Sequence, residues 1–412
     1  MTTINSFEQT QLISSIPEVA LVLELGCVLQ ELRVDASTLE ISLGRVIQHL
    51  GIEGTIFAIS TGFLATLRKE GHHSKTYLMR VTAGSPNLKK LAEAGMLLDS
   101  FLRGDLDVTE TRKRLNKITT QKPKFGFWSK AVASSLAAIG MVNIWGGCWL
   151  DVLCGSIVGL VVGLAVGLVE NKAKLASFAP LMAGIISALA GSFISHIMPS
   201  TTYITIVLGG VVCLIPGLEL LVAMQELGTG NLVSGTARTA GAGLIFILLT
   251  LGIGCGQQLG SFLWPHKYNN PIGAIPWTVV PSLALVVLGY LIIFQGRLVD
   301  YGYTLLIGIL TWYGNIYCIK VLGDTAGAGI TALILGAGCN YYAQRSRNPE
   351  TIILLPTILL ILPGSLGIRG LTMIMGKQPL VGIQSGFQYF YVTIALMLGL
   401  LMANAMVSRR TF

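Results

Sequence analysis

Hydrophobic and polar positions change their period along the chain, and this change divides the chain into two parts. In the first part, apolar positions recur at helical spacing over residues 12–34 and 37–50, and again in NLKKLAEAGMLLDSFLRG and DLDVTETRKRLNKI. Asp107, with Glu110 three residues on, is the predicted cap of the last of these helices. Between these segments, GTIFAISTGFLATL is rich in β-branched residues, and KTYLMRVT alternates apolar with polar positions. This combination predicts a small α+β domain over residues 1–125.

After a basic and aromatic segment that begins at RKRLNKI, apolar runs follow one another to the end of the chain. Each is close to the roughly 20 residues that a helix needs to cross the hydrocarbon core of a bilayer. The ten runs lie near residues 131–149, 152–169, 178–197, 202–224, 239–259, 277–295, 299–318, 325–343, 351–373 and 386–407. The sequence therefore predicts a polytopic α-helical membrane protein with ten transmembrane helices.

Composition agrees with this fold class. Of the 412 residues, 52% are hydrophobic and 12% are charged, and the mean hydropathy is +0.70. These values are typical of a membrane protein and exclude an ordinary soluble enzyme. The start of the chain, MTTINSFEQT, lacks the basic and apolar stretches of a signal peptide. We therefore expect the N-terminal domain to stay in the cytoplasm.

The distribution of lysine and arginine orients the predicted spans. If the chain starts in the cytoplasm, the cytoplasmic segments from Arg112 onward carry fifteen Lys and Arg residues. The outer links carry four, namely Lys267, Lys320, Arg369 and Lys377. Cations collect on the cytoplasmic side of membrane proteins. We therefore expect a multi-pass protein of the cell (inner) membrane with both termini in the cytoplasm.

One predicted span contains a break. In LIPGLELLVAMQEL, residues 214–227, Pro216 and Gly217 interrupt the apolar run and Glu219 follows at once. Proline removes an intrahelical hydrogen bond and clashes with the preceding turn, and glycine lets the chain bend. Inside a bilayer, the freed backbone groups are tolerated only against protein or a wet cavity. We therefore expect a broken helix beside a hydrated cavity.

A second break follows 147 residues later, in ILPGSLGIRGLTMIM, with Pro363, Gly364 and Arg369. The two breaks fall in the fourth and the ninth span. Downstream, LGTGNLVSG at 227–235 matches MGKQPLVGI at 375–383 in a glycine, a leucine and a valine. These matches indicate an internal duplication.

The duplication predicts two five-helix repeats, residues 126–262 and 274–412. Because five is odd, the second repeat must enter the membrane in the opposite orientation. Paired interruptions in two inverted halves are typical of transporters whose site lies near the bilayer midplane.

Charged residues near the breaks suggest chemistry for such a site. Glu219 lies inside a predicted span, where an ionisable group is costly and marks a proton or substrate site by default. Arg238 could bind a substrate carboxylate with two parallel hydrogen bonds, and Arg369 is its rough counterpart. A salt bridge between Glu219 and Arg238 is the alternative interpretation. The candidate pathway residues are Pro216, Gly217, Glu219, Arg238, Pro363, Gly364 and Arg369.

Other polar residues have simpler explanations. His72 and His73 adjoin a glycine in a predicted turn, and Asp35 and Glu40 fit a helix cap and a solvated face. The seven cysteines show neither CxxC nor a metal-ligand spacing with histidine. We therefore expect no enzyme activity, metal, cofactor or nucleic-acid partner.

The chain resembles the threonine/serine exporter family over almost its whole length. The residues that carry the resemblance are LRVDASTLEISLGRVIQHLG, RVT, NLKKLAEAGMLLDSFLRGDL, IPGLEL, GTARTAGA and LPGSLGIRGL. The match is looser between Arg33 and Glu40. The resemblance implies a cytoplasmic α+β domain joined to ten spans, and proton-driven export of small amino acids such as threonine and serine. Related two-protein systems, split between the fifth and sixth spans, are associated with dicarboxylate export.

Several hypotheses remain open from the sequence. The first is a proton-coupled exporter of a small carboxylated metabolite, either an amino acid or a dicarboxylate. The second is an enzyme whose catalytic domain is residues 1–125 and whose membrane helices are an anchor. The third is a passive channel or scaffold. The partners expected under the first hypothesis are the substrate, protons and the lipid bilayer.

Overall fold

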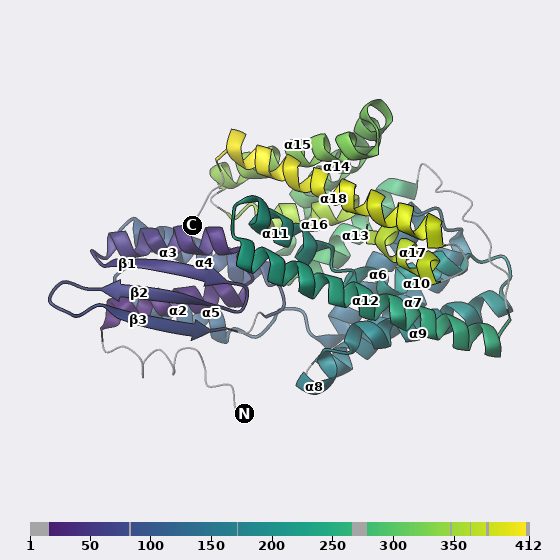
Figure 1. The fold of residues 1–412 in the computed structure, drawn as a ribbon, viewed down its shortest axis with the longest axis horizontal. Coiled ribbons are helices and arrows are strands. Elements are labelled where there is room, and N and C mark those ends of the chain that lie inside the picture. Colours follow the sequence, from purple (N-terminus) through teal and green to yellow (C-terminus); the bar gives the residue numbers. More distant parts are fainter. Residues whose placement is uncertain are drawn as a thin grey trace.

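The computed structural model describes residues 16–81, 84–170, 172–265, 278–346, 348–362, 364–375 and 379–408. Figure 1 shows an elongated, mostly helical molecule with a small sheet at one end. We call residues 16–120, which contain the sheet and its helices, the N-terminal region. The side of the helical body next to this region is called the near side, and the opposite side the far side.

The N-terminal region has the mixed α and β elements predicted from the sequence. Its helices are α2 (Pro17–Glu31), α3 (Ala36–His49), α4 (Leu88–Leu102) and α5 (Val108–Thr120), and its strands are β1 (Glu53–Ile59), β2 (Gly62–Arg68) and β3 (Lys75–Arg80). The predicted cap of α5 is confirmed, because the Asp107 carboxylate accepts a hydrogen bond from the Glu110 amide at 2.8 Å.

The three strands form an antiparallel sheet in the order β1-β2-β3. Alternate residues of β2, among them Phe63, Ala65 and Leu67, are buried, and Phe63 packs against Gly26 of α2. On the remaining strands Phe57 and Leu78 stay exposed. The sheet is therefore covered by helices on one face only, as the period of two in its sequence requires.

Helices occupy all ten ranges in which the sequence predicts membrane spans. They are α6 (Phe127–Ile144), α7 (Trp149–Glu170), α9 (Ala179–Ile197), α10 (Tyr203–Val211) with α11 (Gly217–Gly228), α12 (Leu232–Leu263), α13 (Val279–Ile293), α14 (Tyr301–Leu322), α15 (Asp324–Ser346), α16 (Thr351–Ile361) with α17 (Gly364–Met375), and α18 (Pro379–Met406).

Among the described residues, six of these helices are long and apolar enough to cross a membrane, and counting each bent pair as one span gives eight. The two others are α13, which has 15 residues, and α15. The protein is therefore a polytopic helical membrane protein.

The two predicted breaks are present as bends. The axis turns by 57° between Tyr203–Leu214 and Glu219–Gly228, and by 42° between Thr351–Ile361 and Gly364–Gly370. Pro363, the proline of the second break, lies outside the described residues.

The same helix pairings recur in the two halves of the helical body. In the first half α9 packs along α12, and in the second half α15 packs along α18. Between the halves α6 packs along α13. At the far ends of α6 and α13, the Asn143 amide donates hydrogen bonds of 2.8 Å to the hydroxyls of Thr278 and Ser282.

The N-terminal region is bound to the near side by backbone hydrogen bonds. The first amides of α4, on Leu88 and Lys89, donate to the carbonyls of Phe294 and Gln295 at the end of α13, at 2.9 and 3.2 Å. The Gln295 side chain also donates to the Phe125 carbonyl and accepts from the Phe125 amide. These bonds give partners to backbone amides that the start of a helix leaves unpaired.

Candidate functional site

A cavity of about 540 Å³ extends from the N-terminal region to both helix breaks. Its near-side lining includes Arg33, Phe125 and Lys130. Its inner lining includes Pro216 and Gly217 of the first break and Gly364 and Ser365 of the second, together with Glu219 and Leu362. This volume lies within the range of small-molecule sites, roughly 300–1,000 Å³.

The two breaks contact each other in a reciprocal way. A Cβ on Gly217 would collide with the Leu362 side chain, and a Cβ on Gly364 would lie 2.6 Å from the Ile215 side chain. Ile215 precedes Gly217 by two residues, and Leu362 precedes Gly364 by two. Each glycine thus packs against the equivalent apolar side chain of the other break, and a larger residue at either position would separate them.

The local backbone is also the same at the two breaks. The Gly217 amide donates to the Ile215 carbonyl, and the Gly364 amide donates to the Leu362 carbonyl, both at 2.8 Å. Each of these tight turns is followed at once by a new helix. The amino-terminal ends of α11 and α17, whose first amides carry partial positive charge, therefore both border the cavity.

Charged side chains gather where α11 faces the N-terminal region. Glu219, in the first turn of α11, forms an ion pair with Arg33 of the N-terminal region. Its other carboxylate oxygen lies 3.9 Å from the guanidinium of Arg238 on α12. The side chains of Arg33 and Glu219 are 30% and 21% exposed, and both line the cavity.

A second carboxylate completes this charge network. Glu226, in the last turn of α11, is 1% exposed and lies 3.1 Å from Nε of Arg238. It also accepts hydrogen bonds from the Ser234 hydroxyl at 2.7 Å and the Ala36 amide at 3.1 Å. A buried carboxylate is stable only with such partners. Arg238 and Glu226 therefore form the buried base of the network, with Glu219 between this base and the cavity.

Arg33 occupies an unusual backbone position. Its φ of 62° is in the left-handed region, where a residue other than glycine costs about 1 kcal/mol. It follows the end of α2, where the Val34 amide bonds to the Leu29 carbonyl and the Arg33 amide to the Gln30 carbonyl. Glycine is the usual residue at this position of such a helix end. The Arg33 side chain uses the position to reach the Gly84 carbonyl, at 2.6 Å, and Glu219.

The environment of Arg33 is strongly electrostatic. Burial, and next the positive charge of Arg238, lower the pKa of the Arg33 guanidinium. Arginine still remains charged near neutral pH because its ordinary pKa lies far above neutrality. The two arginines therefore repel each other across Glu219, and the carboxylate between them offsets this repulsion.

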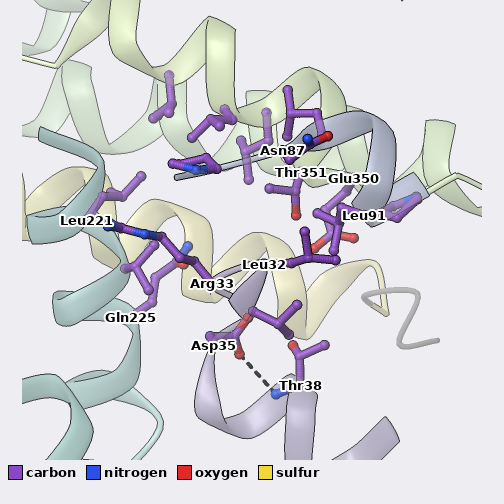
Figure 2. Close-up of a pocket in the computed structure, with 18 residues that line it drawn as sticks. Leu32, Arg33, Asp35, Thr38, Asn87, Leu91, Leu221, Gln225, Glu350 and Thr351 are labelled. Carbon is purple, nitrogen blue, oxygen red and sulfur yellow. Dashed lines mark hydrogen bonds between the residues drawn. The ribbon is translucent and has the colours of Figure 1, made fainter. Parts of the chain in front are cut away.

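A smaller cavity of about 80 Å³ lies between the N-terminal region and α11. Figure 2 shows Arg33 beside Leu221 and Gln225, with Glu350 and Thr351 at the start of α16 on another wall. The loop that carries Arg33 is held on this side by Asp35, which caps α3 by accepting from the Thr38 amide at 3.0 Å. The lining of this cavity shows that the N-terminal region packs against both broken spans.

Comparison with known families agrees with this architecture. Two family models, both described as threonine/serine exporter, match residues 20–260 and 280–406. The chain belongs to the threonine/serine exporter family. The resemblance inferred from the sequence motifs is thereby confirmed.

Several curated relatives are similar at low identity. The chain is 21% identical over 324 residues to an uncharacterised protein of Schizosaccharomyces pombe, covering 75% of this chain and 38% of the relative. It is 23% identical over 317 residues to the threonine/serine exporter of Corynebacterium glutamicum, covering 72% and 62%. It is 25% identical over 326 residues to pheromone-regulated membrane protein 10 of Candida albicans, covering 75% and 28%.

The chain thus spans between 28% and 62% of the length of these three relatives. No solved structure matches the chain.

Within this exporter-family chain, the structure places the residues predicted from the sequence in three ways. Pro216, Gly217, Glu219 and Gly364 line the shared cavity. Arg238 is 9% exposed and lies behind Glu219, so the salt bridge weighed as an alternative is present. Arg369 is on α17, outside the described lining of the cavity.

Two charged residues of the site, Glu226 and Arg33, are not among those predicted from the sequence. Glu226 follows the predicted span by two residues, so it was assigned to a link. Arg33 belongs to the N-terminal region and lies inside the helical pattern predicted over residues 12–34, whereas α2 ends at Glu31, so no local signal marked it. Glu40 also has a partner that the sequence did not indicate, because it accepts from the Ala58 amide at 2.8 Å.

Proposed function

We propose that this protein is a secondary transporter that exports small amino acids such as threonine and serine from the cytoplasm, driven by the proton gradient. Membership of the exporter family supports this proposal. The single observation that carries it is the cavity in which the two helix breaks meet. Interrupted helices at the interface of two halves are the usual position of a transporter binding site.

The proposal includes ten spans in two inverted repeats. Support comes from the positions of the helix ends: α6 ends and α13 begins on the far side, where Asn143 bonds Thr278. The end of α13 and the start of α16 lie on the near side, against the N-terminal region. The break in α10–α11 therefore leads toward the near side, and the break in α16–α17 leads away from it.

We assign the near side to the cytoplasm, with both termini there and the protein in the cell membrane. Lys130 and Glu170, which pair at 3.1 Å, lie at the near-side lining of the cavity, and the segment before α6 is rich in lysine and arginine. The proposed boundaries remain 1–125 for the cytoplasmic domain and 126–262 and 274–412 for the repeats. In this orientation the end of the cavity lined by Arg33, Phe125 and Lys130 faces the cytoplasm.

Glu219 is the proposed proton carrier. It is the carboxylate that both borders the cavity and contacts two guanidinium groups of the network. Protonation would neutralise it and weaken both contacts, because an ion pair loses its Coulomb attraction when one charge is removed. A proton would thereby change how the N-terminal region and α12 are held to α11.

The test is flux through purified protein in liposomes with an imposed pH gradient. We expect accumulation of labelled threonine or serine that requires the gradient and is abolished in Glu219→Gln. Flux of dicarboxylates alone would favour the dicarboxylate alternative, and pH-independent flux in both proteins would favour a passive channel. Absence of flux for both substrate classes would overturn the proposal.

A further inference from the structure

The Arg33–Glu219 pair presents two opposite charges to one cavity. Each residue comes from a different part of the molecule, and each side chain is partly exposed to the lining. The Arg33 guanidinium is anchored through Nε to the Gly84 carbonyl, which leaves its terminal NH₂ groups for Glu219. A ligand with a carboxylate and an ammonium group matches this pair charge for charge.

We propose that Arg33 and Glu219 are the residues that bind an α-amino acid by its two charged groups. The carboxylate of the substrate binds the guanidinium of Arg33, and its ammonium group binds the carboxylate of Glu219. The internal ion pair opens and is replaced by two ion pairs with the substrate. This inference rests on the proposed export function, and it assigns two substrate-binding residues and a role for the N-terminal region in the transport site.

The charges around the pair favour a zwitterion. Behind it, Arg238 and Glu226 carry one positive and one negative charge, and at the near side Lys130 and Glu170 pair with each other. The six groups sum to zero, so a neutral zwitterion leaves the site neutral. A dicarboxylate would place its second carboxylate against Glu219, where like charges in a partly buried site repel.

Arg238 supports Glu219 during this exchange. Its guanidinium lies 3.9 Å from Glu219 and 3.1 Å from Glu226. When Arg33 turns to the substrate carboxylate, Glu219 keeps one cationic neighbour, which offsets its negative charge. The bonds from Ser234 and Ala36 hold Glu226, and through it Arg238, in place.

The competing explanation is that Arg33 only ties the N-terminal region to α11. The two explanations differ in which ligands a substitution affects. If Arg33 only holds the N-terminal region on α11, its substitution should change the affinity for every ligand by the same factor. If Arg33 binds the substrate, its substitution should change the affinity only for ligands that carry a carboxylate.

The experiment measures dissociation constants on the full-length purified protein for a series of threonine analogues. Threonine carries both charged groups, its methyl ester lacks the carboxylate, 2,3-dihydroxybutanoate lacks the ammonium group, and malate is the dicarboxylate. The variants are Arg33→Gln, Arg33→Gly and Glu219→Gln. Arg33→Gly removes the guanidinium and suits the left-handed backbone, so it guards against misfolding. Arg68→Gln, at the exposed Arg68–Glu53 pair of the sheet, is the matched control.

Wild-type protein should bind threonine about 10- to 100-fold more tightly than the ester or the hydroxy acid, because each loss removes a charge-assisted hydrogen bond. Both Arg33 variants should bind threonine as weakly as the wild-type protein binds the ester. Their affinity for the ester should equal that of the wild type. Glu219→Gln should lower the affinity for threonine and leave the affinity for the hydroxy acid unchanged. Arg68→Gln should behave as wild type.

Two results would overturn the inference: the first leaves the proposed export of amino acids standing, and the second replaces it with dicarboxylate export. One is an equal loss of affinity for all four ligands in the Arg33 variants. The other is wild-type protein that transports malate and is not inhibited by threonine. If wild-type protein moved none of these compounds across liposomes, the proposed function would fail as well.

Discussion

The two broken spans share a backbone design but differ in their charges. Each has a tight turn before a glycine, and each glycine packs against the apolar residue that stands two positions before the glycine of the other. The first half-helix, α11, carries two carboxylates that pair with arginines. The described lining contributed by the second break, at Leu362, Gly364 and Ser365, is uncharged.

The position of each half-helix relative to the N-terminal region explains this difference. The half-helix α11 contacts the N-terminal region, where Ala36 bonds Glu226 and Arg33 pairs with Glu219. The half-helix α17 leads toward the far side, away from that region. The two breaks therefore share their backbone geometry, whereas ion pairs with the N-terminal region occur at the first break.

The largest predicted effect concerns Glu226. Glu226→Ala should lower the free energy of unfolding by about 3–5 kcal/mol, because it leaves Arg238 buried without its closer carboxylate partner. Glu226→Gln keeps an oxygen for the Ser234 and Ala36 donors and should recover part of the loss. Thermal or denaturant unfolding in detergent measures both.

The matched control is Met373, which is the equivalent of Glu226 in α17 at the 147-residue offset and is 36% exposed. Met373→Ala should change stability by less than about 1 kcal/mol, as is usual at partly exposed positions without special partners. Equal losses of stability in Glu226→Ala and Met373→Ala would show that the charge difference between the two half-helices does not matter for stability.

A smaller effect is predicted at the contact that both spans share. Gly217→Val should destabilise the protein by about 1–3 kcal/mol, the usual cost of overpacking, and should abolish flux because its side chain collides with Leu362. Adding Leu362→Ala should restore part of both.

Gly338→Ala is the control for this substitution, because a Cβ there meets nothing within 4 Å. We expect its unfolding and flux to match the wild type. If Gly217→Val also behaved as wild type, the contact between the two breaks would be contradicted.

The smallest effect is predicted for an ion pair remote from both breaks. Glu18 pairs with Lys69 at 2.8 Å, and the hydrogen bond from Lys69, followed by a backbone hydrogen bond, lowers the pKa of Glu18. Such partly exposed pairs contribute at most about 1 kcal/mol. Glu18→Gln should therefore cost no more than this at neutral pH and should leave flux unchanged.

The sign of the pH dependence follows from the lowered pKa. The stabilisation by Glu18 is complete above its unfolded pKa of about 4.3 and is lost as pH falls through the lower folded value. The stability difference between wild type and Glu18→Gln should therefore disappear in acid. A difference that grew on acidification would show that the Lys69 pair is not its source.

Much of the scaffold could be predicted from the sequence because it depends on local signals. Apolar run length placed a helix in each predicted span, and the Pro216–Gly217 dipeptide located a bend. Asp107 was recognisable as a cap because its hydrogen bond spans only three residues.

The charge network could not be predicted in the same way. Arg33 and Glu219 are 186 residues apart, and their contact depends on how the N-terminal region docks on α11. Arg238 was expected to face a substrate, but its nearer partner is Glu226, which the span count had placed outside the membrane. Long-range pairings of this kind depend on tertiary packing, on which local sequence patterns give little information.

The central claim is that the two breaks meet, and a disulfide tests it directly. A Cβ on Gly364 would lie 3.7 Å from the Cβ of Ile215, close to the mean of about 3.8 Å between disulfide-bonded Cβ atoms. In a Cys213→Ser background, Ile215→Cys with Gly364→Cys should form a disulfide under mild oxidation, detected by mass spectrometry, and should stop flux until reduced. Absence of this disulfide in folded protein, with the same recovery of free thiols as in an Ile215→Cys and Gly338→Cys control, would contradict the account.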